Sequence, residues 1–281
     1  MKLQLGCKLA YTVQADTPFI FNIEAQSTGS QRINSESLRL VPDLPIDRWT
    51  MPESGNRYFK VNVSPGDLLV EYSAEVSLAS ALDDPADVTE IGLADMPLWV
   101  FPHLYPSRYC QSDKLERFAR STFGALDPGY DRVNGVCNWI CDYVAYEGGV
   151  SDALTTAFDT VTQRAGVCRD FSHLAIALCR IQGIPARYVS AYAAKLNPPD
   201  FHAVFEAYLK GPDGNAWYMF DATRKADPAG IVRIGLGRDA AEVAFCSAYG
   251  AMTFQKPEVW ISQIGDIVPT TIQAVRLLEQ S

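Results

Sequence analysis

The sequence predicts an α+β protein: a β-rich amino-terminal part, followed by a part in which a buried helix packs on an antiparallel β-sheet. Three observations predict this class. Apolar and polar residues alternate in several runs before residue 79, residues 171–181 are apolar on nearly every helical face, and alternating runs at 201–209 and 217–220 flank a turn. Alternation with period two is typical of half-buried strands, and a helix without a polar face lies inside a domain.

The amino-terminal alternation predicts strands that are apolar on one face only. The runs cover residues 3–13, 19–25, 59–63 and 68–78, and the sequence Ser-Pro-Gly-Asp separates the last two. Strands of this kind form an antiparallel sheet or a small sandwich.

The alternation fails between residues 78 and 110, which are rich in Pro, Asp and aromatic residues. We interpret this segment as a connector between domains. The predicted organisation is therefore a β-rich, sandwich-like amino-terminal domain over residues 1–105 and a catalytic domain over residues 106–281.

Helical spacing predicts helices over residues 112–123, with Ser112 as the cap, and over residues 131–146. The buried helix at 171–181 ends at Gly183. The alanine-rich stretch that begins at Asp239 and contains Cys246 is also expected to be helical.

Composition and charge exclude several functions. The formal net charge is −9, whereas nucleic-acid binding requires basic patches, so we expect no nucleic-acid partner. No run of 18 apolar residues and no signal-peptide pattern is visible, which predicts no membrane association and a cytoplasmic location. The seven cysteines are odd in number and irregularly spaced, which favours reduced thiols. Cys137 and Cys141 lack a second ligand pair at zinc spacing, and neither a metal nor another cofactor is predicted.

Cys168 is the predicted nucleophile. It lies immediately before the apolar run 171–181, close to the start of that helix. The positive end of a helix dipole favours a thiolate over a thiol. The backbone N–H of Cys168 is a predicted oxyanion donor, and Gln163 is a weaker candidate for a second donor.

His202 is the predicted base, chosen from only three histidines. His173 is about 140° around the helix from Cys168, so it is expected to hydrogen-bond within the core, and His103 lies in the connector. If the turn at 211–214 is centred between residues 212 and 213, paired residues have numbers that add up to about 425. Asp221 then falls opposite His202 or one step diagonal to it, where it can orient the imidazole.

Two further acidic residues near these groups are given supporting roles. Asp170 lies two residues after Cys168 and is expected to pair with an arginine or a backbone group near the site. Glu206 lies on the His202 face of its strand but two pairs further on, so it is expected to be structural.

The segment 166–192, GVCRDFSHLAIALCRIQGIPARYVSAY, resembles the core signature of the transglutaminase-like superfamily. The resemblance places that family's catalytic triad on Cys168, on His202 in FHAVFEAYL and on Asp221 in WYMFDATR. It implies a papain-like core, with the nucleophile helix packed on an antiparallel sheet that carries the base and the acid. Val204 stands where many relatives have Trp, and Ala222 where many have Pro; neither change removes a catalytic group.

The resemblance implies three functional alternatives. The first is a cysteine hydrolase, a protease, peptidase or amidase, that cleaves amide bonds of a protein or peptide substrate through a thioester on Cys168. The second is a protein-glutamine transglutaminase, which passes the acyl group to an amine instead of water. The third is a catalytically idle scaffold that binds peptides, although such a scaffold has no need to retain all three triad residues.

Overall fold

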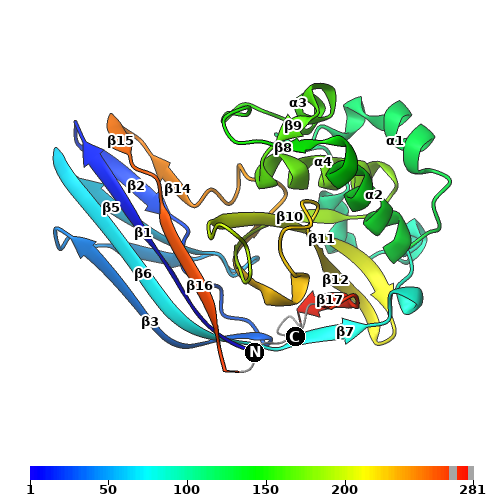
Figure 1. Cartoon of the computed structure of the whole chain (residues 1–281), viewed down its shortest axis with the longest axis horizontal. Coiled ribbons are helices and arrows are strands. Elements are labelled where there is room, and N and C mark those ends of the chain that lie inside the picture. The colour runs from blue at the N-terminus through cyan, green and yellow to red at the C-terminus, as the bar shows by residue number, and fades with distance from the viewer. Residues whose placement is uncertain (266–270, 278–281) are drawn as a thin grey trace.

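The computed structural model describes residues 1–265 and 271–277, and in these residues most strands belong to three antiparallel sheets (Figure 1). Two of these sheets form the amino-terminal part. The first has the order β15 (Met252–Phe254), β1 (Lys2–Val13), β6 (Gly66–Leu78) and β3 (Gln31–Val41), and β16 (Glu258–Ile264) also pairs with β1. The second has the order β14 (Cys246–Ala248), β2 (Thr17–Phe21), β5 (Arg57–Val63) and β4 (Asp47–Thr50).

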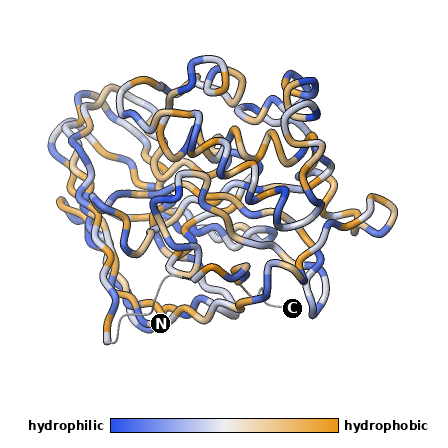
Figure 2. Tube along the Cα trace, turned by 45° about the vertical axis from the view of Figure 1, so that its right-hand side comes forward, coloured by the Kyte–Doolittle hydropathy of each residue, from blue (hydrophilic) through white to orange (hydrophobic). Residues whose placement is uncertain are grey.

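The strands of this part alternate in burial as they do in sequence. In β6 every second residue from Leu68 to Leu78 is buried. Figure 2 shows hydrophobic and hydrophilic residues interspersed along the traces of the chain. Buried side chains of β1, β2, β5 and β6 share one hydrophobic core. The prediction of a β-rich amino-terminal part is confirmed.

The third sheet carries the predicted hairpin. Its order is β13 (Ile231–Gly237), β10 (Ala186–Ala193), β11 (Phe201–Gly211), β12 (Gly214–Phe220), β17 (Ala274–Leu277) and β7 (Ser80–Asp83). Phe205 pairs with Phe220 and Gly211 with Gly214, so the predicted register of the hairpin is confirmed.

Helices cover one face of this sheet. The buried helix α4 (Cys168–Ile181) packs against β10 and β11, and it is surrounded by α1 (Glu116–Phe123), α2 (Tyr130–Tyr143) and α3 (Ala157–Gln163). Ala203, Phe205 and Ala207 of β11 belong to the core shared with these helices, whereas Val204 belongs to the core of the amino-terminal sheets. Both faces of β11 are therefore covered, which explains its nearly continuous burial.

The two parts of the chain exchange strands. β7, from before residue 105, pairs with β17 in the third sheet, while β14, β15 and β16 return to pair with β1 and β2. A hydrophobic core also runs from β1 and β6 into β10 and β13. The division near residue 105 stays a prediction, and the strands on either side of it are interleaved.

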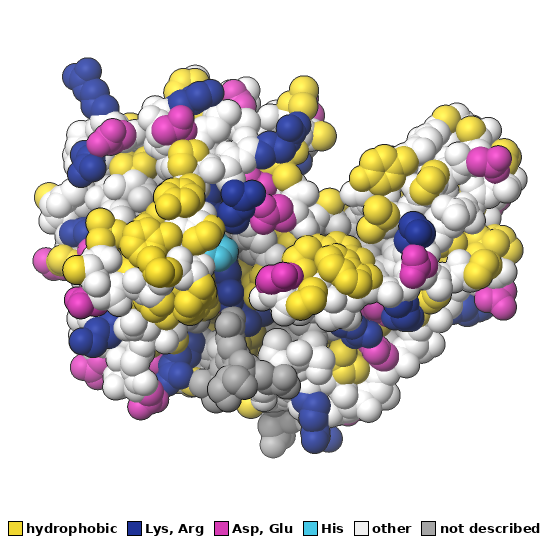
Figure 3. All heavy atoms as spheres, turned by 180° about the vertical axis from the view of Figure 1, so that it is seen from behind, with side chains coloured by type: hydrophobic (Ala, Val, Ile, Leu, Met, Phe, Trp, Pro, Cys, Tyr) yellow, Lys and Arg dark blue, Asp and Glu magenta, His cyan; other side chains and the backbone are white. Residues whose placement is uncertain are grey.

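The surface is notched between the two parts when seen from behind, and hydrophobic side chains gather in patches on it (Figure 3). Large exposed apolar residues include Leu98, which is 86% exposed, and Trp99 in the 3₁₀ segment Leu98–His103.

The helix expected from Asp239 was wrong. Residues 239–245 form turns in which the Asp239 carboxylate accepts the backbone N–H of Ala241, and Cys246 lies in β14, paired with Phe21 of β2. Backbone pairing with a distant strand outweighs the helix propensity of alanine. Ser112 was also wrong as a cap: it lies in the 3₁₀ turn Ser112–Lys114, and α1 begins after Leu115.

Candidate active site

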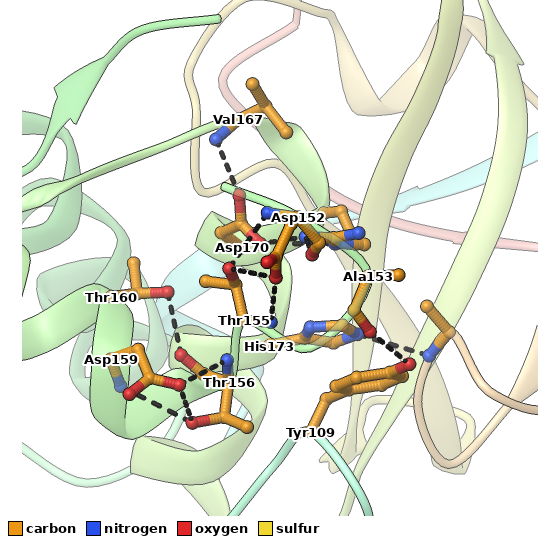
Figure 4. Close-up of polar contacts among 12 residues, drawn as sticks. Tyr109, Asp152, Ala153, Thr155, Thr156, Asp159, Thr160, Val167, Asp170 and His173 are labelled. Atoms are coloured by element: carbon orange, nitrogen blue, oxygen red, sulfur yellow. Dashed lines mark hydrogen bonds and ion pairs between the residues drawn. The ribbon is translucent and has the colours of Figure 1, made fainter. Parts of the chain in front are cut away.

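Cys168 is the first residue of α4, and the buried side chain of Asp170 fixes that helix start. The Asp170 carboxylate accepts the backbone N–H of Val167 at 2.9 Å, which satisfies one of the free donors at the helix end (Figure 4). Arg169 pairs with the same carboxylate at 2.9 Å. A Cβ at Gly166 would lie 2.7 Å from the Asp170 Cβ, so only glycine fits beside this carboxylate.

The loop before α3 is held against the same helix start. The Arg169 guanidinium donates to the carbonyl of Asp152 at 2.5 Å, and the Tyr109 hydroxyl donates to the carbonyl of Ala153 at 2.8 Å. Thr156 and Asp159 cap α3 by reciprocal hydrogen bonds (Figure 4). These contacts place the loop beside Cys168.

His202 and Asp221 come together at the open end of the hairpin. His202 is near the start of β11, Asp221 follows β12, and the imidazole Nε2 lies 3.1 Å from the Asp221 carboxylate. Both side chains are buried. The carboxylate also accepts hydrogen bonds from Thr223 and from the backbone N–H of Ala226, so its position is fixed from several sides.

The charges of this pair depend on each other. Burial opposes a charge on the imidazole, but Asp221 and Cys168 outweigh it and raise the pKa of His202 from 6.5 to about 10. Burial also opposes a charge on Asp221, yet His202, Thr223 and Ala226 together lower the pKa of this carboxyl. An imidazolium next to a carboxylate is therefore the favoured state at neutral pH.

Cys168 and His202 line the same cavity, which has a volume of about 310 Å³. Because Nε2 of His202 faces Asp221, Nδ1 is the nitrogen left for the Cys168 thiol, whose interaction with the imidazole contributes to the raised pKa of His202. The structure thus brings together Cys168, His202 and Asp221 from a helix start and two adjacent strands.

Tyr146 is a residue of this site that the sequence did not reveal. Burial, followed by interactions with the Cys168 thiol, shifts the pKa of its hydroxyl upward, and a hydrogen bond from the Cys168 backbone N–H partly offsets this shift. The Lys225 ammonium lies 4.4 Å from the centre of its ring. Tyr146 was assigned to the end of a helix, but it lies in β8 (Ala145–Tyr146), which pairs with β9 (Ala165–Gly166) just before Cys168.

Gln163 is not brought to the nucleophile. Its side chain is exposed at the end of α3 and does not line the cavity. Its role as a second oxyanion donor stays a prediction, and it is Tyr146 that contacts the Cys168 backbone N–H.

Glu206 and His173 are held in the core. The Glu206 carboxylate pairs with Arg187 at 2.7 Å and with Arg233. His173 accepts the backbone N–H of Ala240 and stacks on Tyr109, and burial lowers its pKa to about 3, which keeps it neutral. The hydrogen bonds found for these two side chains go to Arg187, Arg233 and Ala240, and not to Cys168.

Within residues 1–265 and 271–277 no cluster of three or more His, Cys, Asp or Glu side chains could hold a metal ion. In the same ranges no helix has the length and apolar character needed to cross a membrane.

Comparison with known proteins gives two family matches. Residues 116–222 match the model of the transglutaminase-like superfamily, and residues 1–97 match the bacterial transglutaminase amino-terminal domain. A solved structure, described as a "Putative Cysteine Protease" from Cytophaga hutchinsonii, is 38% identical with a TM-score of 0.92. The alignment covers 98% of this chain and 97% of that one.

Two curated relatives from mycobacteria are similar over shorter regions. An uncharacterized protein of Mycobacterium leprae is 30% identical over 121 residues, 40% of this chain and 42% of that protein. One of Mycobacterium tuberculosis is 30% identical over 144 residues, 47% of this chain and 46% of that protein. The chain thus spans less than half the length of these curated relatives.

Proposed function

Because the chain belongs to the transglutaminase-like superfamily and is a papain-like cysteine enzyme, we propose that it hydrolyses amide bonds through a thioester on Cys168. One observation carries this proposal. The thiol of Cys168 and the imidazole of His202, which is hydrogen-bonded to Asp221, line a single cavity large enough for part of a peptide.

The proposed reaction begins with attack of the Cys168 sulfur on the carbonyl carbon, and the thiol proton is held on Nδ1 of His202. The developing oxyanion is stabilised by the backbone N–H of Cys168, the donor that Tyr146 engages in the free protein. His202 then protonates the amide nitrogen, the C–N bond breaks and an amine leaves. Water attacks the thioester, gives one proton to His202 and releases a carboxylic acid, and the thiol is restored. Asp221 stabilises the positive charge of the His202 imidazolium and keeps its ring oriented toward the sulfur.

An activated thiol can be tested by alkylation with iodoacetamide at pH 6, with mass spectrometry to locate the adduct. We expect Cys168 to react selectively, because ordinary thiols are largely protonated at this pH. His202→Ala should slow the reaction at Cys168 by about tenfold or more, since the imidazolium that stabilises the thiolate is lost.

Cys141 is exposed and serves as the internal reference thiol. If Cys168 in the folded wild-type protein reacts no faster than Cys141, the hydrolase proposal fails and a peptide-binding scaffold becomes the better account. If selective alkylation is found, product analysis with peptides in the presence of a primary amine separates hydrolysis from transfer to the amine.

Asp221→Asn is expected to move the pKa of His202 down from about 10 toward 6.5, because the negative partner of the imidazolium is removed. A raised pKa in the folded state stabilises the fold fully below pH 6.5, and this contribution disappears as the pH rises through about 10. Between pH 6.5 and about 10, the free energy of unfolding of the variant should therefore fall less than that of wild type. An NMR titration measures the pKa of His202 from the chemical shifts of its ring. The same His202 pKa in the variant and in wild type would contradict the assigned pairing with Asp221.

A further inference from the structure

We propose that the cavity beside Cys168 binds one large apolar side chain of the acyl part of the substrate. This inference rests on the proposed hydrolysis and adds the class of substrate residue that precedes the cleaved bond. The geometry, the polarity and the charge of the cavity walls each support it.

The cavity is built from segments that are far apart in sequence. Cys168 and Arg169 come from the start of α4, other lining residues come from β10, β11 and β13, and one wall is the turn segment 240–245. The aromatic rings of Phe201 and Phe245 stack at 5.0 Å on this side. A volume of about 310 Å³ is at the lower end for ligand sites, which suits a single large side chain. The apolar lining residues include Phe201, Ala203, Ile234, Val243, Ala244 and Phe245.

Two of the polar side chains in the walls, Arg169 and Tyr109, are already engaged in hydrogen bonds. The Arg169 guanidinium bonds to Asp170 and to the Asp152 carbonyl, and the Tyr109 hydroxyl donates to Ala153. The Oγ of Ser190 is buried and has no hydrogen-bond partner among the described residues, so it is free to make a hydrogen bond to an occupant. A single hydroxyl does not replace the hydration of a charged side chain.

An occupant with a charge would therefore lose its water without compensation, at a cost of several kcal/mol for an unpaired ion, on the order given for buried charges. A glutamine carboxamide has several donor and acceptor positions, and the Ser190 hydroxyl can satisfy only part of them. Burial of an apolar side chain has no such cost and gains about 25 cal/mol for each Å² removed from water. The walls thus favour aromatic and large aliphatic side chains over charged and amide ones.

The position of the cavity assigns this side chain to the acyl part. The walls include Cys168 itself, the residue that holds the acyl group during both steps. A side chain bound there stays in place while the amine leaves and water enters. Its binding can therefore lower the barrier to thioester formation and the barrier to thioester hydrolysis.

The test uses peptide chloromethyl ketones, in which the Cys168 sulfur displaces chloride from the methylene carbon. The series carries Phe, Leu, Gly, Gln, Glu or Lys at the residue that bears the ketone, and iodoacetamide serves as a reagent without a side chain. We expect the Phe and Leu reagents to alkylate Cys168 about 10 to 200 times faster than the Gly reagent, the range found for apolar pockets. The Gln, Glu and Lys reagents should show no such gain.

A matched pair of variants tests the location. Ala244 lines the cavity and Ala241 does not, and both side chains are exposed, so tryptophan is tolerated by the fold at either position. Ala244→Trp should reduce alkylation by the Phe reagent about tenfold or more, as expected when an apolar pocket is filled. Ala244→Trp should slow alkylation by iodoacetamide less than alkylation by the Phe reagent, because iodoacetamide has no side chain to place in the cavity. Both rates of Ala241→Trp should stay near those of wild type.

The outcomes separate this inference from the proposed function. If iodoacetamide alkylates Cys168 selectively but the Phe, Gly and Glu reagents react at equal rates, the side-chain preference is wrong and the hydrolase proposal stands. The same conclusion follows if Ala244→Trp and Ala241→Trp behave alike with the Phe reagent. If Cys168 reacts selectively with neither kind of reagent, the proposed function fails and this inference fails with it.

Discussion

Cys168→Ala is expected to abolish amide hydrolysis, with a loss of at least about 10⁴-fold in turnover, as seen when the nucleophile of a catalytic triad is removed. The thioester cannot form without the sulfur, and the Asp221 carboxylate is held by His202, Thr223 and Ala226 and does not line the cavity. Turnover is measured on a peptide with a large apolar residue before the scissile bond.

The control for this substitution is Cys141→Ala. Cys141 is an exposed thiol on α2, and its sulfur contacts only the carbonyl of Thr223 among the hydrogen bonds found in the described residues. Its replacement should leave turnover within about twofold, as is usual for surface substitutions. Hydrolysis that persists at the wild-type rate in Cys168→Ala would show that the reaction does not pass through this residue.

Glu206→Gln is expected to lower the free energy of unfolding by about 3 to 5 kcal/mol, the range for breaking a buried ion pair by removing one partner. Glu206 is fully buried in β11, where its carboxylate contacts the guanidinium groups of Arg187 and Arg233. The amide keeps the volume but removes the negative charge that both arginines contact. Denaturation by guanidinium chloride, monitored by tryptophan fluorescence, measures the loss.

Glu242→Gln is the matched control, because Glu242 pairs with Arg238 at 2.7 Å near the surface. The side chains of this pair are 44% and 39% exposed, so its loss should cost no more than about 1 kcal/mol. Equal effects of the two substitutions would mean that the buried cluster contributes no more than a surface pair. Because β11 also carries His202, unfolding of this strand would displace the proposed base. A loss of turnover in Glu206→Gln is therefore expected only at temperatures where the variant begins to unfold.

The sequence alone determined the arrangement of the proposed triad because each part of it depends on a local signal. The turn at residues 211–214 sets the register of β11 and β12 over a span of 20 residues, and this register brings His202 to Asp221. The apolar run after Cys168 predicts a buried helix, and the first residue of α4 is Cys168. Turn chemistry and helix periodicity act between neighbours in the chain, so they can be seen in the sequence.

Tertiary contacts decided the remaining features. Tyr146 reaches Cys168 because β8 pairs with β9, and Gln163 points to solvent because α3 ends before that pair. The segment 239–245 forms a wall of the cavity instead of a helix, since the chain continues into β14 on the edge of an amino-terminal sheet. Strand pairing between residues more than 200 positions apart depends on partners that no local pattern contains. For that reason the sequence predicted the proposed reacting groups, whereas only the folded structure decided the shape and polarity of the cavity beside them.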